Sequence, residues 1–176
     1  MKGYLVVLAS SNDFLGRASN LKYRGVYRIP PYPSKIAEEE RAMDEYVFGD
    51  FKSEEGVIAS LERAKDLLEL FAMSPRRYEV IYYETIDEAE SAETTHALRL
   101  LGYDVAFATG DRWSIVMDYP EHVQMEKYKN LLNNVGLFDQ PVAAERFLQE
   151  YRRLKLPEYE MNLAVLRVFE LENTGL

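Results

Sequence analysis

The sequence predicts a single α+β domain, in which about five helices pack on a mixed or mainly antiparallel sheet of about five to six strands. Runs of β-forming residues are interspersed with segments of helical periodicity. Two of these runs are joined by Gly110-Asp111, which suits a two-residue hairpin turn and favours antiparallel pairing. The 176 residues suffice for one well-buried core, and no internal repeat or long linker divides them.

Strands are expected where β-forming residues are concentrated and turn residues bound the run. The run 78–85 (YEVIYYET) is expected to be a central strand, and 4–9 a buried one. The hairpin 104–118 pairs residues whose numbers sum to 221, and both of its faces are apolar, so it is expected inside the sheet. The remaining strands are expected at 22–30 and 160–171.

The clearest helix is expected to begin at a Ser53 cap and to end at the Ser74-Pro75 pair. Acidic Glu54 and Glu55 suit the positive end of its dipole. Apolar residues recur along it at three- and four-residue steps. They are Val57, Ile58, Leu61, Ala64, Leu68 and Phe71.

Capping residues and periodicity place four further helices. One begins near Asp87 and stops at Gly102, because glycine readily takes the left-handed conformation found at helix ends. The others are expected at 34–47, capped by Ser34, at 121–135, and at 140–154, capped by Asp139.

The charge balance is strongly acidic, with a net charge of −9 from 30 acids and 21 bases. The acids are concentrated, since 38–66 holds ten of them against four bases and 78–98 holds six against none. Such a surface repels phosphate backbones, so nucleic acid is not expected as a partner. A basic protein is the natural complement, and a solvated acidic exterior that serves solubility is the alternative.

The leading hypothesis for function is therefore a non-enzymatic binding domain that engages a basic partner protein, in the manner of an immunity or inhibitor protein. The 13 tyrosines favour a contact surface, although they would equally fill the strands of a half-buried sheet. Self-association into a homo-oligomer is left open. The binding surface is expected at the acidic helix starts and around the following residues: Tyr82, Glu84, Asp87, Glu88, Glu90, Glu93, Tyr103, Asp104, Asp118 and Tyr119.

The competing hypothesis is a small hydrolase-like enzyme that uses acid-base chemistry. Glu84, Glu90 or Glu93 would act with His96 around a cleft, because a carboxyl group with a raised pKa can serve as a general acid or base. Convergence of two of these groups in a deep pocket would favour the enzyme, and a flat acidic surface would favour the binding domain.

Several chemistries are not expected. The chain has no cysteine, which excludes disulfides, thiolate metal sites and a thiol nucleophile and suits the reducing cytoplasm. Glu93 and His96 have the spacing of a helix that offers two metal ligands, but His122 lacks the matching glutamate, so neither a metal nor a cofactor is expected. Only five apolar residues stand in a row near the start, at 5–9, so no membrane span is expected there.

Overall fold

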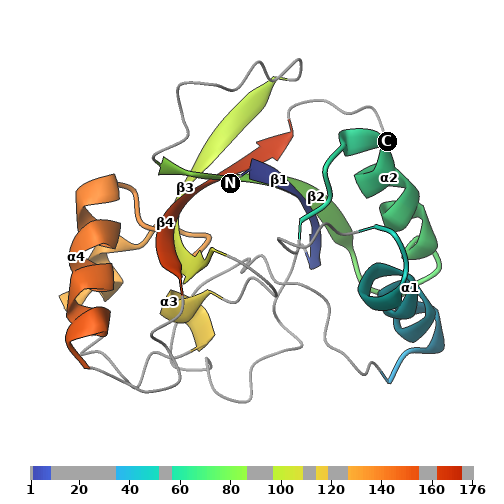
Figure 1. The fold of residues 1–176 in the computed structure, drawn as a ribbon, viewed down its shortest axis with the longest axis horizontal. Helices are drawn as coiled ribbons and strands as arrows, with labels where there is room; N and C mark the ends of the chain where they lie inside the picture. The colour runs from blue at the N-terminus through green and yellow to red at the C-terminus, as the bar shows by residue number, and fades with distance from the viewer. Residues whose placement is uncertain are drawn as a thin grey trace.

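The computed structural model describes residues 2–8, 35–51, 57–86, 97–108, 114–118, 127–154 and 162–171. Within these ranges the strands form one antiparallel sheet of four, in the order β1-β2-β4-β3 (Figure 1). Their bounds are Lys2–Leu8 for β1, Tyr78–Thr85 for β2, Leu98–Phe107 for β3 and Leu163–Leu171 for β4. The sheet is curved, and β2 and β4 are its central strands.

Helices flank the sheet at two opposite ends (Figure 1). At one end lie α1 (Ala37–Phe48) and α2 (Leu61–Leu70), which pack on each other, and α2 also packs on β1 and β2. At the other end, α4 (Pro141–Arg153) packs on β3 and β4. Two single turns complete the described elements: α3 (Ile115–Asp118), which packs on β3, and the 3-10 turn η5 (Lys129–Leu131).

The apolar core is divided in the same way as the helices. One cluster joins β1 and β2 to the inner faces of α1 and α2, through residues such as Leu5, Ile81 and Leu67. The second joins β4 and β3 to α4, and its rings of Tyr128, Phe138 and Phe147 pack against one another. Because α2 and α4 each bury one face against the sheet, the opposite face of each is left to the surface.

The α+β class is confirmed, but the expected numbers of elements are wrong. Instead of five to six strands and about five helices, the described residues form four strands and three helices of ten or more residues. The strand expected at 22–30 and the N-terminal part of the helix expected from Asp87 lie outside the described residues. The described part of the helix expected at 121–135 holds only the turn η5.

The predicted hairpin is also wrong. Its first arm belongs to the longer strand β3, whose apolar residues pair with β4, as Val105 does with Val165. Its second arm forms the helical turn α3 instead of a strand. One bridge, between Ala106 and Ser114, joins the two arms, and β3 is an edge strand among those described rather than an interior one.

Gly102 does not end a helix but lies at an irregularity within β3. Its φ of 148° is in the region that favours glycine. A Cβ atom there would lie 2.8 Å from both the Leu137 Cβ and the Phe138 carbonyl oxygen. The glycine therefore lets the 133–138 segment approach the outer edge of β3, where Tyr103 and Phe138 exchange backbone hydrogen bonds.

We expect Gly102→Ala to lower the free energy of unfolding by about 2 kcal/mol, because backbone strain adds to the clash with a carbonyl oxygen. Urea unfolding followed by circular dichroism measures this loss. Leu100→Ala, at an exposed position two residues earlier in the same strand, is the control and should change stability far less. Equal losses in the two variants would contradict this account of Gly102.

The predictions for α4 and α2 are partly confirmed. α4 agrees with 140–154 within a residue at each end, but its N-cap is Gln140 rather than Asp139. α2 begins after Ser60, whose hydroxyl accepts a hydrogen bond from the Arg63 N–H, and not at Ser53. α2 starts later than predicted because Ile58 exchanges backbone hydrogen bonds with Tyr4 at the edge of the sheet.

None of the described helices has the length and apolar character that crossing a membrane requires.

Candidate functional site

The outer face of α2 carries a line of acidic side chains. Leu61, Ala64 and Leu67 face the core, so the opposite side of the helix is directed outward. Glu62, Asp66 and Glu69 follow one another at steps of four and three residues and are all exposed, so they lie on one side of the helix. We call these three residues the acidic stripe.

No residue of the acidic stripe has an ion-pair or hydrogen-bond partner among the described residues. Like charges four residues apart on a helix repel each other, by a few tenths of a kcal/mol. Glu69 also lies in the last turn, near the negative end of the helix dipole, where α2 has no basic residue. The repulsion among the three carboxylates and the position of Glu69 are therefore unfavourable, whereas Glu62 in the first turn suits the helix dipole.

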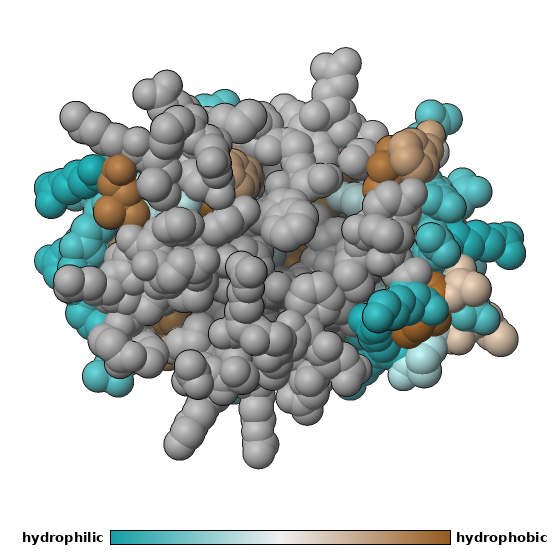
Figure 2. Space-filling model, turned by 90° about the horizontal axis from the view of Figure 1, so that it is seen from below, coloured by the Kyte–Doolittle hydropathy of each residue, from teal (hydrophilic) through white to brown (hydrophobic). Residues whose placement is uncertain are grey.

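Apolar side chains accompany this acidic end of the molecule. Met73, four residues after Glu69 and in the turn that follows α2, is 80% exposed. Phe48, at the end of α1, is also largely exposed. Seen from below, hydrophilic side chains gather at the end that carries α1 and α2, with apolar ones among them, and again at the opposite end (Figure 2).

Glu84 and Tyr82, two of the predicted binding residues, lie buried in the centre of the sheet. The Glu84 Oε1 atom forms an ion pair with Arg167 Nη2 of the neighbouring strand β4, at 2.9 Å. The Tyr82 ring packs between Tyr4 and Phe169, at centroid distances of 5.1 and 6.0 Å. These buried side chains offer little surface to a partner, and their contacts stabilise the sheet.

Asp104 is also buried, and it accepts hydrogen bonds from the Ser114 hydroxyl at 2.7 Å and from the Val105 N–H at 2.8 Å. It thereby ties α3 to β3. Tyr103 is partly buried at the edge of β3, and Asp118 is the last residue of α3. The other predicted site residues lie outside the described ranges: Asp87, Glu88, Glu90, Glu93, His96 and Tyr119.

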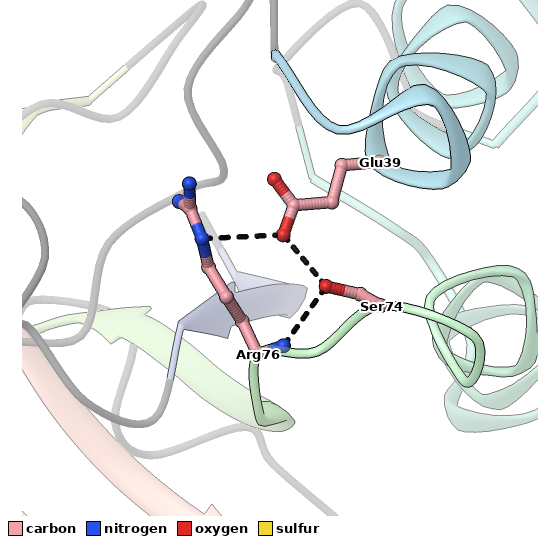
Figure 3. Close-up of polar contacts among 3 residues, drawn as sticks. All are labelled: Glu39, Ser74 and Arg76. Atoms are coloured by element: carbon pink, nitrogen blue, oxygen red, sulfur yellow. Dashed lines mark hydrogen bonds and ion pairs between the residues drawn. The ribbon is translucent and has the colours of Figure 1, made fainter.

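A third buried carboxylate belongs to Glu39, which in the sequence is only one of many acids. It points inward from α1 with 0% of its surface exposed (Figure 3). The Ser74 hydroxyl donates to its Oε1 atom at 2.7 Å, and the Arg76 Nε lies 3.5 Å from the same atom. Ser74 in turn accepts the Arg76 backbone N–H at 3.1 Å, so one carboxylate joins α1 to the turn between α2 and β2.

Buried tyrosines carry raised pKa values. Burial, assisted by the negative charge of Glu84, raises the pKa of Tyr82 to about 12. Burial also raises the pKa of Tyr78, which lies beside Glu39, and that of Tyr128, whose hydroxyl donates to Glu150 at 2.6 Å. These rings belong to the core, so the tyrosines of the described strands fit the structural explanation of their abundance rather than a contact surface.

We expect these tyrosines to limit stability at high pH. An unfolded tyrosine ionises near pH 10, whereas Tyr82 in the folded protein keeps its proton to about pH 12. Their contribution to stability is therefore complete below about pH 10 and is lost as the pH rises toward 12. Phenolate absorbance measured together with circular dichroism should show these rings ionising only as the fold is lost, and ionisation of every tyrosine near pH 10 in a folded protein would contradict this.

The described residues hold no group of three or more potential metal ligands. No protein-family model matches the chain, and neither does any curated protein or solved structure.

The acidic stripe could have been found from the sequence. The same periodicity that places Leu61 and Ala64 inward places Glu62, Asp66 and Glu69 together on the other side.

Proposed function

We propose that the protein is a non-enzymatic binding domain that engages a basic partner protein through the outer face of α2, as an immunity or inhibitor protein would engage its target. The observation that supports this proposal is the acidic stripe. Three carboxylates stand in line, without ion-pair or hydrogen-bond partners among the described residues, and Asp66 repels both of the others. A basic partner would turn this repulsion into attraction on binding.

The apolar side chain at the end of the stripe adds to this argument. Complementary charges mainly speed the encounter of two proteins, while burial of apolar groups supplies much of the affinity. Met73 is exposed beside the stripe and would supply such a contact. The competing acid-base enzyme gains no support from Glu84, because its carboxylate is buried and already paired with Arg167.

We expect Asp66→Lys to weaken partner binding about tenfold or more while it stabilises the isolated protein by about 0.5 kcal/mol. A lysine at this position attracts both Glu62 and Glu69, where the aspartate repels them. It also repels Arg63, which lies against the Phe51 ring. Urea unfolding gives the change in stability, and affinity is measured by titration calorimetry on the captured partner.

The partner is first captured from a native lysate on immobilised wild-type protein and identified by mass spectrometry. Glu145→Lys is the matched control, since it reverses an exposed acid on α4, at the other end of the molecule. A basic protein should be held by wild type and by Glu145→Lys, but released by Asp66→Lys and by high salt. Equal capture by all three proteins, or capture that ignores salt, would refute the proposal.

A further inference from the structure

The outer face of α4 mirrors that of α2. Val142, Arg146, Gln149 and Arg153 are all exposed and follow one another at steps of four, three and four residues, so they lie along one side of the helix. The residues Glu62, Asp66, Glu69 and Met73 have the same steps. We call the α4 set the basic stripe, because its two charged members are arginines.

The arginines of the basic stripe act electrostatically on groups of their own molecule, Arg153 on the Glu150 carboxyl and Arg146 on Tyr128, but no direct contact within the described ranges holds them. Neither Arg146 nor Arg153 has an ion pair or hydrogen bond among the described residues. Val142 is 53% exposed at the start of the helix, where it leaves an apolar side chain in the same line. Two helices of one molecule thus present exposed stripes of opposite charge, with Val142 at the start of one and Met73 in the turn that follows the other.

The two stripes match in order when the helices run antiparallel. Glu62 then faces Arg153, Asp66 faces Gln149, Glu69 faces Arg146, and Met73 faces Val142. Every charged group of the acidic stripe meets a base or an amide donor, and the two apolar side chains meet each other. The opposite, parallel order would set Met73 against Arg153 and Glu62 against Val142.

We propose that the protein associates with a second copy of itself, by antiparallel docking of α2 of one molecule on α4 of the next. The inference rests on the proposed function. The chain as a whole is acidic, with a net charge of −9, so the local basic stripe of another copy takes the place of the basic partner. Since α2 and α4 lie at opposite ends of the sheet (Figure 1), two molecules satisfy only one such contact. The association is therefore head to tail and forms open chains rather than closed dimers.

A contact of four side chains from each helix is small, so the association is weak and depends on concentration. Sedimentation velocity at about 0.15 M salt is the suitable measurement, because charges beyond about 8 Å are then screened while groups in contact are not. The mean sedimentation coefficient of the wild-type protein should rise steadily as its concentration approaches about 1 mM. A constant monomer value over this range would overturn the inference.

Two charge-reversed proteins test the assigned contact. Glu62→Lys with Glu69→Lys reverses the acidic stripe, and Arg146→Glu with Arg153→Glu reverses the basic one. Each protein alone should associate at least tenfold more weakly than wild type. An equimolar mixture should recover association, because every α2 then finds an α4 of opposite charge.

Glu38→Lys with Glu45→Lys is the matched control, since these exposed acids of α1 have the same seven-residue spacing and lie off the stripe. This control should associate as wild type does. Circular dichroism verifies that all variants are folded. Recovery in the mixture supports the docking of α2 on α4, and association of wild type without recovery overturns it.

The outcome is separable from that of the proposed function. If wild type stays monomeric but captures a different basic protein in a way that Asp66→Lys abolishes, self-docking is refuted and the proposed function stands. If the captured protein is the chain itself, and the mixture recovers association, both are supported. If wild type associates in a way that the stripe variants leave unchanged, and captures no basic protein that Asp66→Lys releases, both are refuted.

Discussion

Replacing Arg76 with methionine is expected to lower the free energy of unfolding by about 3 kcal/mol. The Glu39 carboxylate is fully buried, and Arg76 supplies a positive charge beside it. Removing one member of a buried ion pair leaves a charge that neither water nor a partner compensates. Removal of one partner from a buried ion pair usually costs about 3–5 kcal/mol of stability. We expect the lower value here because the Arg76 side chain is 22% exposed, so water screens the pair in part.

The neighbouring residue provides a control with the same substitution. Arg77 pairs with Glu79 at 2.8 Å, but its side chain is 79% exposed. Exposed pairs contribute little, so Arg77→Met should lower stability by less than about 0.5 kcal/mol. Urea unfolding of the two variants tests the assignment, and a similar loss in both would show that the buried Glu39 contact does not stabilise the fold.

Replacing Arg167 with methionine is expected to cost about 3 kcal/mol as well, because it leaves the buried Glu84 carboxylate without its partner in the middle of the sheet. Arg99→Met is the control, since Arg99 forms a more exposed pair with Glu170 between β3 and β4. Chemical unfolding monitored by circular dichroism measures both losses.

A double variant separates loss of the pair from loss of packing. If the uncompensated charge causes the loss, Arg167→Met combined with Glu84→Leu should recover most of the stability, because apolar side chains often replace a buried ion pair without cost. Failure of the second substitution to restore stability would assign the effect to other contacts of Arg167, such as that of its guanidinium group with the Phe169 ring.

The elements that local patterns specify were predicted well. The strand 78–85 was predicted with its observed bounds, and it is central as expected. The strand β4 and the helix α4 also fall within the predicted ranges. In these segments β-forming composition or helical periodicity agrees with the tertiary environment, so local and long-range preferences lead to the same structure.

The errors arose where a contact distant in sequence decides the structure. Gly102 and Gly110-Asp111 have the composition of a helix end and a hairpin turn, but the partner of β3 is β4, about sixty residues later. Ile58 fits the apolar pattern of a helix, yet it pairs with Tyr4 at the edge of the sheet. Local sequence carries no information about such distant partners. A glycine or a two-residue turn pattern therefore does not suffice to predict a helix end or a hairpin.

In the candidate site, too, features of a single helix can be predicted and contacts between distant residues cannot. Periodicity alone suffices to find the acidic stripe, because it is a property of one helix. The burial of Glu39, Glu84 and Asp104 could not be predicted, since each carboxylate is compensated by a residue from another part of the chain. A count of acids cannot distinguish these buried groups from those on the surface.

The strand order has a consequence for how the chain acquires its structure. The central strand β4 is the last of the four in sequence, and it pairs with both β2 and β3. During synthesis the earlier strands emerge before their common neighbour, so β3 has no sheet to join until residues 163–171 have left the ribosome. Pairings over such sequence separations slow folding, and unfinished chains carry exposed strand edges that favour aggregation.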